Sequence, residues 1–568
     1  MPLETPSRIV SELASRGYNA EREAVTILAG SPEPALALEA AIEHAPDDAL
    51  RITTEHVRAV LDADGAPDAP TAPGADAATA TGSARKGAGA SLQDDGESEN
   101  GHPSVSTGTP GSRSDGAEGA APVETKGSNG RSTGAESTGA ESTDAGSTAA
   151  GSTAAGSTGS VHDRDPSLRS LEIANDMTGQ STGTGEYKHF VQTFRDRYER
   201  LSGLLRGRVN HRPAESIQHM AGGEDAAMIG LVNDVRSTAS GHWLIELEDT
   251  TGTFPALVMK DKGIADMVEE IMMDECIAID GTLADDAGIL FADSIHFPDV
   301  PRTHKPSTAD RHVQAALISD VHVGSDEFMA DAWHRFAEWL HTDEAEHVEY
   351  LLICGDMVEG VGVYPDQDDE LDIVDIYEQY ETFSEHLKEV PSDMEIVMIP
   401  GNHDAVRLAE PQPGFDEELR EIMSAHDARI VSNPATVTVE GVSILMYHGV
   451  SLDEVIAELP EAKASYDDPH KAMYQLLKKR HVAPQYGGHV RMAPEEKDYL
   501  TIDEVPDVFH TGHVHKLGWG KYHNVLAVNS GCWQAQTDFQ ESVNIDPDAG
   551  YAPILDLDTL EMTVRKFS

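Results

Sequence analysis

The chain has 568 residues, more than one hydrophobic core usually organises, so we expect two to four domains. Aspartate and glutamate number 100 against 41 lysines and arginines, a formal net charge of -59, which argues against binding nucleic acid by broad electrostatic attraction. Concentrated salt would relax that exclusion, because the Debye length falls to about 3 Å at 1 M salt. Since the acids are spread along the chain, we interpret them as a sign of a salt-rich cytoplasm rather than of a basic partner.

The cysteines and the N-terminal residues bear on the compartment. Cys276, Cys354 and Cys532 lie far apart in apolar contexts, so neither a disulfide framework nor a cysteine zinc site is predicted. The first twenty residues lack a basic region followed by an apolar core, and no apolar run is long enough to span a bilayer. We therefore expect a cytoplasmic protein with no membrane partner.

Residues 1–65 have the spacing of short helices. The apolar residues that recur at this spacing are Ile9, Leu13, Ala24, Ile27, Leu28, Leu36, Leu38 and Ile42. The pattern predicts a helical N-terminal module of about four short helices. With no catalytic residue pattern in this stretch, docking is the function we expect for it.

Residues 66–185 have a different composition. No Phe, Trp or Tyr occurs between Tyr18 and Tyr187, and Gly, Ser, Thr, Ala and Asp dominate. Such a segment cannot bury enough apolar surface to offset its chain entropy. It is predicted to be a disordered low-complexity linker.

Residues 186–304 are predicted to form a helix and a small barrel. The helix covers Glu186–Leu205, and five short strand-like segments follow, with a helical segment before the fourth. This order is typical of a β-barrel of the oligonucleotide-binding type. The aromatic and basic residues available for nucleic-acid contact are His242, Trp243, Phe254, Arg236 and Lys260. The favoured alternative is that these aromatics are barrel core and the barrel binds protein.

Residues 305–568 alternate between strands and helices, and the strands are continuous apolar runs of the kind buried on both faces. An α/β domain with a sheet core and flanking helices is predicted. Five of the strands end in polar residues, which are in turn Asp320 and His322; Asp356; Asn402, His403 and Asp404; His448; and His513 and His515. Strand ends of this kind converge on one crevice in α/β sheets, so these side chains are expected to form one site.

The residue types indicate the chemistry of that site. Carboxylate, imidazole and amide oxygen suit Mn, Fe or Zn better than Ca or Mg. The candidate ligands are seven, Asp320, His322, Asp356, Asn402, His448, His513 and His515, which is too many for one tetrahedral ion with an open position. Two divalent ions roughly 3.5–4 Å apart, Mn first with Fe or Zn as alternatives and Mg as a weaker fit, would use them all. The predicted reaction is phosphoester hydrolysis.

The order D-x-H, G-D, G-N-H-D, H-G and G-H-x-H resembles that of the calcineurin-like metallophosphoesterases, which include the double-strand-break repair nucleases. The resemblance implies a first metal held by Asp320, His322, Asp356 and His515, and a second held by Asp356, Asn402, His448 and His513, with Asp356 bridging. It also implies that His403, oriented by Asp404, stabilises the pentacovalent phosphorus and protonates the leaving oxygen.

A narrower resemblance concerns the C-terminal segments "KKRHVAPQYGGHVRMAPEEKDYLTIDEVPDVFHTGHVH" and "GCWQAQTDFQESVNIDPDAGYAPILDL" together with the upstream barrel. They are similar to the small subunits of the archaeal D-family DNA polymerases. This resemblance implies a 3′-to-5′ proofreading exonuclease that acts on a DNA 3′ end beside a large catalytic polymerase subunit. The alternatives are a non-catalytic scaffold subunit and a free-standing phosphoesterase for proteins or cyclic nucleotides.

Four further groups lie within the narrower resemblance. The basic segment Lys478–His481 and Arg491 either touch the DNA backbone or the partner subunit, or are loop charges on an acidic surface. For Trp533 and Phe539, a place in the core or an interface is favoured over base stacking.

Overall fold

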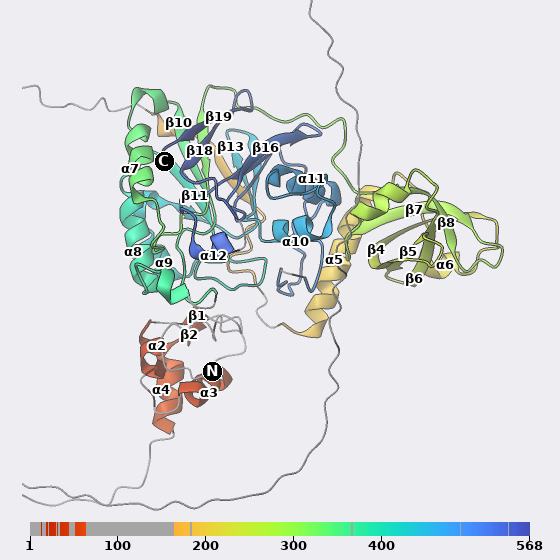
Figure 1. Ribbon diagram of the computed structural model, residues 1–568, viewed down its shortest axis with the longest axis horizontal. Coiled ribbons are helices and arrows are strands. Elements are labelled where there is room, and N and C mark those ends of the chain that lie inside the picture. The colour runs from red at the N-terminus through yellow and green to blue at the C-terminus, as the bar shows by residue number, and fades with distance from the viewer. Residues whose placement is uncertain are drawn as a thin grey trace, which may run out of the picture. The chain divides into compact units, whose positions relative to one another are not determined.

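The computed structural model of the chain describes residues 164–181, 185–364, 367–488, 490–542 and 545–568, together with parts of residues 9–63. These residues form a multidomain protein of mixed α and β structure, with two six-stranded sheets, a closed barrel and a two-stranded sheet (Figure 1). The predicted linker lies outside the described residues from 66 to 163. No helix in the described part of the chain is long and apolar enough to cross a membrane.

The N-terminal module is helical as predicted, with a small sheet that the sequence pattern did not indicate. Its elements are β1 (Asn19–Ala20), α2 (Arg22–Ala29), α3 (Pro34–His44), β2 (Arg51–Ile52) and α4 (Thr54–Ala63), and β1 pairs with β2 in parallel. Ile9, Leu28 and Leu38 are buried in its core. Leu36, which shares their helical spacing, is 63% exposed and is not a core residue.

Residues 164–181 correct the predicted end of the linker at residue 185. They contain η1 (Pro166–Leu168) and β3 (Leu171–Ala174), and β3 pairs antiparallel with β13 (Ala435–Val439) at the edge of a sheet. Leu171 and Ile173 pack against the core between the sheets. Composition does not distinguish so short a strand from the linker before it. The strand forms because β13, far along the chain, supplies its backbone hydrogen-bond partners.

The barrel is closed, with the strand order β4-β5-β6-β8-β7. Its strands are β4 (Asp225–Ser237), β5 (Trp243–Asp249), β6 (Gly252–Val258), β7 (Cys276–Leu283) and β8 (Leu290–His296). The five predicted strands are thus confirmed, and the helical segment before the fourth is the 3-10 helix η2 (Ala265–Glu270). The oligonucleotide-binding type stays a prediction.

Most of the barrel residues considered for nucleic-acid contact already contact other residues of the barrel domain. Phe254 is buried in the barrel core and Trp243 packs against that core, so Phe254 cannot stack on a base. Arg236 forms an ion pair with Asp234 at 2.6 Å. The Lys260 side chain donates a hydrogen bond to the Ser240 carbonyl. The alternative in which the aromatics are barrel core is confirmed for Phe254.

The α/β domain contains two sheets, where the sequence indicated a sheet core. The first sheet has the order β12 (Arg429–Ile430), β11 (Glu395–Ile399), β10 (Val348–Cys354), β9 (Gln314–Ile318), β18 (Tyr551–Asp556) and β19 (Glu561–Lys566). The second has the order β16 (Leu517–Tyr522), β17 (Val525–Ser530), β15 (Val508–Thr511), β14 (Val442–Met446), β13 and β3. Leu317, Tyr350 and Ile444 belong to the core between them. Every residue of β10 is buried, as its continuous apolar run predicts.

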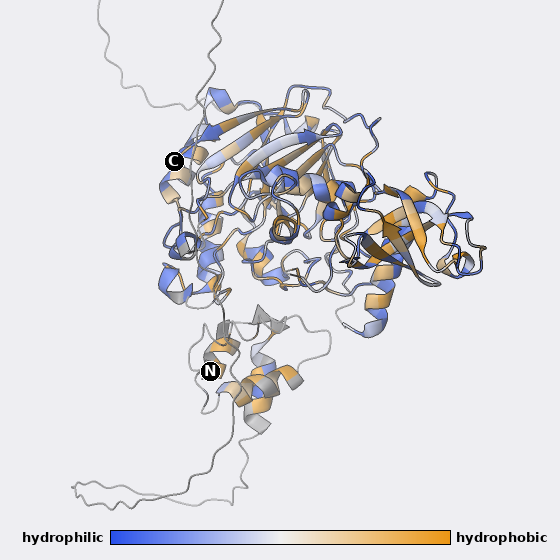
Figure 2. Cartoon of the chain, turned by 45° about the vertical axis from the view of Figure 1, so that its right-hand side comes forward, coloured by the Kyte–Doolittle hydropathy of each residue, from blue (hydrophilic) through white to orange (hydrophobic). Residues whose placement is uncertain are grey.

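Helices cover the outer faces of the two sheets (Figure 1). They are α7 (Ala330–Leu340) and α8 (Ile376–Leu387) on the first sheet, and α10 (Ser451–Glu458) and α11 (Pro469–Lys479) on the second. The remaining short helices of the α/β domain are η3 (Asp343–Ala345), η4 (Gln367–Glu370), α9 (Glu417–Ile422), η5 (Ala425–Asp427) and α12 (Asp538–Ser542), whereas α6 (Ala214–Ile217) packs in the barrel core. Hydrophobic colour gathers on the central strands, while the helices carry both hydrophobic and hydrophilic colour (Figure 2). Trp533 packs against α7 in this core, as expected, whereas the Phe539 side chain lies outside the described residues.

Helix α5 (Tyr187–Leu205), predicted as an amphipathic helix, joins the barrel to the α/β domain. Leu201 and Leu205 pack against barrel residues. On the side of the α/β domain, Arg197 is fully buried and its Nε lies 2.7 Å from the Asp498 carboxylate. His481 Nε2 lies 2.9 Å from the same carboxylate. The two domains are therefore held together by a buried ion pair as well as by apolar contact.

The basic segment Lys478–His481 contributes to this junction. Its three buried residues therefore match neither the expected contact with DNA or a partner nor the alternative of loop charges on an acidic surface. Lys479 is fully buried and its Nζ lies 3.2 Å from the carboxylate of Glu275 in the barrel domain. Arg480 donates to the backbone carbonyl of Ile502, and His481 binds Asp498. Lys478 alone of the four lies partly exposed, and it forms an ion pair with Glu270 at 2.6 Å. Arg491 is exposed.

Replacement of Arg197 by alanine is expected to destabilise the chain by about 3–5 kcal/mol, because it leaves the Asp498 carboxylate buried without its guanidinium partner. Urea unfolding followed by near-ultraviolet circular dichroism measures the loss. The matched control is Arg195→Ala on the exposed face of the same helix. Equal shifts of the unfolding midpoint in the two variants would contradict this role of the buried pair.

Candidate metal centre

The polar residues that end the apolar strands come together at one end of both sheets. Asp320 and His322 follow β9, Asp356 follows β10, and Asn402 and His403 follow β11 in the first sheet; His448 follows β14, and His513 and His515 follow β15 in the second. The strands β9, β10 and β11 are parallel to one another, as are β14 and β15. The structure therefore brings together all seven residues predicted as metal ligands, from two sheets rather than one.

One half of the site contains Asp320, His322 and His515. The Nε2 atoms of His322 and His515 lie 3.1 Å apart. An oxygen of Asp320 lies 3.5 Å from His515 Nε2 and 3.9 Å from His322 Nε2. Asp356 also reaches this half, since its Oδ2 lies 3.9 Å from His322 Nε2.

The other half contains Asp356, Asn402, His448 and His513. His448 Nε2 lies 3.0 Å from Asp356 Oδ2 and 3.0 Å from Asn402 Oδ1. The ligand atoms of Asp356, His448 and His513 all lie within 4.8 Å of one another. His513 Nε2 is also 2.9 Å from the carboxylate of Asp453. Asp356 thus faces both halves, the position that a bridging carboxylate requires.

The hydrogen bonds of the ring nitrogens show that this donor set fits metal ions. His448 Nδ1 lies 2.9 Å from the Cys354 carbonyl, which can only accept, so Nδ1 carries a proton and Nε2 is the atom that faces the site. Nε2 faces the acceptor oxygens of Asp356 and Asn402, whose negative charge is compensated by a proton on Nε2 or by a divalent cation in its place. His322 is held in the same way, with Nδ1 2.7 Å from the Glu359 carboxylate.

The backbone is strained at most of these ligands. Five of them have positive φ, Asp320 at 52°, His322 at 56°, Asp356 at 51°, His513 at 72° and His515 at 53°. For residues other than glycine this conformation costs on the order of 1 kcal/mol each and persists only where the surrounding structure imposes it. The concentration of strain in one set of side chains is typical of a functional site.

Two glycines allow the carboxylates to lie close to the backbone. A Cβ at Gly401 would collide with the Asp356 carboxylate, and a Cβ at Gly512 would collide with that of Asp320. The glycines before Asn402 and His513 are therefore required by the close approach of the two carboxylates.

His403 lies at the rim of the site and is not oriented by Asp404, which corrects the expected role of that aspartate. The backbone N–H of His403 donates to Asp356 Oδ1 at 2.8 Å, and its ring Nδ1 lies 2.7 Å from the carbonyl oxygen of Glu359. Asp404 instead accepts hydrogen bonds from the Gly401 N–H at 2.8 Å and the Tyr380 hydroxyl at 2.9 Å. Asp404 thus fixes the turn that carries Asn402 and His403.

Burial and neighbouring charges shift the pKa values of the ionisable side chains around His403. Burial and the charge of Asp356 raise the pKa of Asp404 to about 7. Burial alone would lower the pKa of His403, but the charges of Asp356 and Glu359 raise it above its usual value. Burial would raise the pKa of Glu359, yet the neighbouring His322 and His403 lower it to about 2. Glu359 is therefore an anion that accepts from His322.

Several residues that orient the ligands have no signal of their own in the sequence. Glu359 is buried beside His322, and its only local clue is its place three residues after Asp356 in "GDMVEG". The Gln534 amide donates to Glu359 at 2.8 Å. The Gln540 amide nitrogen lies 2.9 Å from His515 Nδ1. These contacts join residues separated by up to 175 positions, so only the folded chain reveals them.

Glu359→Gln is expected to weaken divalent-metal binding at least about tenfold, because it removes the charge that fixes the tautomer of His322. Equilibrium dialysis with Mn, followed by elemental analysis, measures the affinity without relying on activity. Glu370→Gln is the matched control, since Glu370 accepts from the nearby Tyr364 hydroxyl rather than from a ligand histidine. Unchanged affinity in Glu359→Gln would exclude this orienting role.

The chain is similar in sequence to known subunits of DNA polymerases. The family of B subunits of DNA polymerases alpha and epsilon matches residues 315–517. The DNA polymerase II small subunit of Halobacterium salinarum is 60% identical over 568 residues, covering 100% of both chains. That of Archaeoglobus fulgidus is 42% identical over 392 residues, 68% of this chain and 78% of the relative.

Solved structures are only distantly similar. A structure titled as a novel archaeal phosphodiesterase is 16% identical and covers 44% of this chain and 99% of its own, with a TM-score of 0.24. Asparaginyl-tRNA synthetase from Pyrococcus horikoshii covers 16% of this chain with a TM-score of 0.15. Scores this low bear on neither fold nor function.

Proposed function

Because this chain belongs to the family of DNA polymerase II small subunits, we propose that it is the 3′-to-5′ exonuclease subunit of a two-subunit replicative DNA polymerase. Its reaction would be hydrolysis of the phosphodiester at a DNA 3′ end. The observation that carries the proposal is the convergence of seven metal-ligand side chains, five of them on strained backbone, at the ends of two sheets. A protein that served only as a scaffold would not need that strain.

The geometry of the two halves supports the metal assignment that the resemblance implies. Asp320, His322, Asp356 and His515 would hold one divalent ion, and Asp356, Asn402, His448 and His513 the other. Imidazole, carboxylate and amide ligands favour Mn, with Fe or Zn as alternatives and Mg as a weaker fit. Bound there, the two ions would neutralise phosphate charge and acidify the attacking water.

The chain's own residues supply proton transfer and positioning. His403 keeps Nδ1 on the Glu359 carbonyl, so Nε2 is the atom available to the substrate. Because its pKa is raised, His403 can carry a proton near neutrality and give it to the departing 3′ oxygen. Asp404 and Tyr380 hold the turn beneath it, so the ring keeps its place while the proton moves.

The partner follows from the family. A small subunit implies a larger one, and we propose that this large subunit carries polymerisation while the present chain removes mismatched 3′ nucleotides. The metal centre then receives a DNA 3′ end that the large subunit releases.

In the complex with the co-purified large subunit, Asp356→Ala is expected to reduce 3′-nucleotide release at least about a thousandfold, because it removes the carboxylate that faces both halves of the site. Stepwise digestion of a 3′-mismatched primer-template in high salt with Mn measures this, and a chelator should have the same effect. Asp331→Ala, exposed on α7, is the control. An inactive wild-type complex with confirmed metal occupancy would favour the scaffold function.

His403→Ala is expected to reduce cleavage by about 100-fold to 10,000-fold while leaving metal content unchanged, because only its backbone N–H contacts Asp356. Digestion of the same primer-template measures the cleavage rate, and elemental analysis of the purified complex measures the metal content. Loss of metal from the variant would assign His403 to the ligand set instead.

A further inference from the structure

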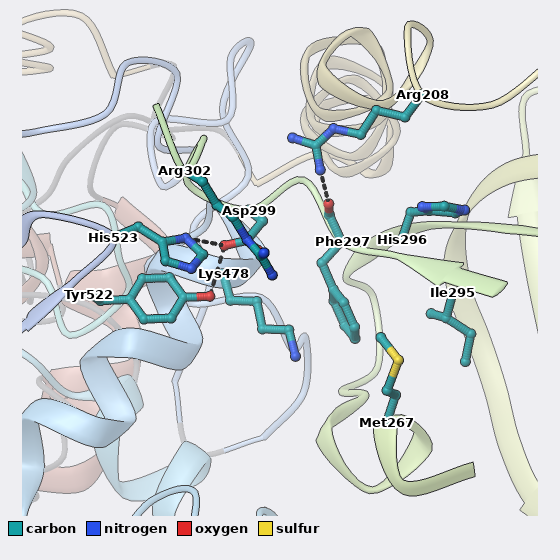
Figure 3. Close-up of a pocket in the computed structure, with 10 residues that line it drawn as sticks. All are labelled: Arg208, Met267, Ile295, His296, Phe297, Asp299, Arg302, Lys478, Tyr522 and His523. Atoms are coloured by element: carbon teal, nitrogen blue, oxygen red, sulfur yellow. Dashed lines mark hydrogen bonds and ion pairs between the residues drawn. The ribbon is translucent and has the colours of Figure 1, made fainter. Parts of the chain in front are cut away.

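We propose that the edge strand β16 and the pocket at its far end form the track on which the single-stranded end of the DNA substrate lies. The strand begins just after the ligand residue His515, at Leu517, and ends at Tyr522, which lines the pocket (Figure 3). This inference rests on the proposed exonuclease function and adds the route by which the DNA reaches the metal centre.

The pocket lies at the seam between the barrel and the α/β domain and has a volume of about 340 Å³. Ile295 and His296 line it from the barrel, and Lys478 and His523 line it from the α/β domain. Figure 3 shows side chains of both domains facing this space. A site shared by two domains in this way is open to a strand that runs along their junction.

The charge of the pocket is opposite to that of the chain. Arg208, Arg302 and Lys478 line it against a single carboxylate, Asp299, in a protein that has 100 acidic residues and 41 lysines and arginines. The Asp299 carboxylate already accepts a hydrogen bond from the Tyr522 hydroxyl at 2.8 Å. This local excess of cations suits an anionic ligand.

Two of the three cations keep their charge available. Lys478 is neutralised by Glu270 at 2.6 Å. Arg208 donates to the backbone carbonyl of Phe297 at 2.7 Å, an uncharged partner that leaves its positive charge uncompensated (Figure 3). Arg302 forms no hydrogen bond or ion pair with any residue in the described ranges. Both guanidinium groups can therefore contact phosphates.

Strand β16 presents a stacking surface between the pocket and the metal centre. Gly518 and Gly520 face α11, because a Cβ at either position would meet Pro469 or Tyr474. Side chains alternate along a strand, so Trp519 lies on the opposite face, where 47% of it is exposed. Tyr522 shares the α11 face, so a nucleic-acid strand that leaves the pocket would cross the open edge of β16 to reach Trp519. An exposed indole on an edge strand that starts at the active site is well placed to stack on a nucleobase.

A third available cation lies on β16 itself. The Lys521 side chain is exposed and makes no hydrogen bond or ion pair among the residues that the structure describes. Aromatic platforms combined with cations along the backbone are the usual means of holding a single strand without reading its sequence. From Leu517 to Tyr522 the strand extends about 17 Å, which matches about five nucleotides stacked at 3.4 Å each.

The first test separates the track from the chemistry. In the complex with the large subunit, Trp519→Ala is expected to raise the KM for a single-stranded oligonucleotide about tenfold while kcat stays within about twofold, since stacking contributes to binding alone. Hydrolysis of bis(p-nitrophenyl) phosphate, which is too small to reach Trp519, should be unchanged. Tyr187→Ala on α5, where the side chain is 82% exposed, is the matched aromatic control.

The second test measures the phosphate contacts without cleavage. In the His403→Ala background, fluorescence anisotropy of a labelled oligonucleotide gives Kd as a function of salt. The double variant Lys521→Glu and Arg302→Glu is expected to lower the slope of log Kd against log salt by about 1.4, because each phosphate that is no longer neutralised lowers it by about 0.7. Lys388→Glu, at an exposed position just after α8, is the control and should leave the slope unchanged.

The outcomes distinguish this inference from the proposed function. Failure of the wild-type complex to hydrolyse the small ester would count against the exonuclease, while the anisotropy measurements still test the track. Hydrolysis of the ester with an unchanged oligonucleotide KM in Trp519→Ala, and an unchanged salt slope in the double variant, would overturn the track. Loss of the large subunit from these variants would also overturn it, because the surface would then be a protein interface.

Discussion

Two carboxylates, Asp320 and Asp356, are buried side by side where the ends of the two sheets meet, with 0% and 1% of their surface exposed. An ionised carboxylate in such a place costs several kcal/mol unless other groups compensate its charge. Histidines provide that compensation here: burial would lower the pKa of His448, yet Asp356 and Asp320 raise it to about 10. The surrounding loops therefore lie where their histidines and N–H groups can compensate the charge of these two acids.

The same carboxylates hold the sheets in register with each other. Asp320 follows a strand of the first sheet, and its oxygens accept the backbone N–H of His513, which follows a strand of the second, at 3.0 and 2.9 Å. Asp356 accepts the N–H of His403 in the same manner from the neighbouring strand end. Because each proposed ligand acid also accepts a hydrogen bond from a neighbouring loop, these contacts within the chain fix the geometry of the site. That preorganisation explains why strained backbone is tolerated at five of the ligands.

Three basic residues are buried at or beside the junction with the barrel. Arg197 and Lys479 pair with carboxylates across the two domains, and Arg480 donates to a backbone carbonyl within the α/β domain. In a chain with a net charge of -59, few cations then remain for DNA, and those that do remain have a correspondingly large influence on where a phosphate backbone can approach. The available cations Arg208, Arg302 and Lys521 are the local exceptions to a repulsive surface.

The sequence by itself determined which polar residues gather at the strand ends and which strands carry them, because each of these features is local: an apolar run, then a turn with Asp, Asn or His. The closed barrel and helix α5 were predictable for the same reason, since alternation and helical spacing are read within one segment. Only the tertiary structure decided what is non-local. It divided the strands between two sheets and added β3 to one of them. It also placed Asp404 in contact with the turn at Gly401 instead of with the His403 ring, and Glu359 in contact with His322. These features depend on pairs of residues that are distant in the chain and are brought together by the packing of the sheets, and no pattern within a single segment encodes such pairs.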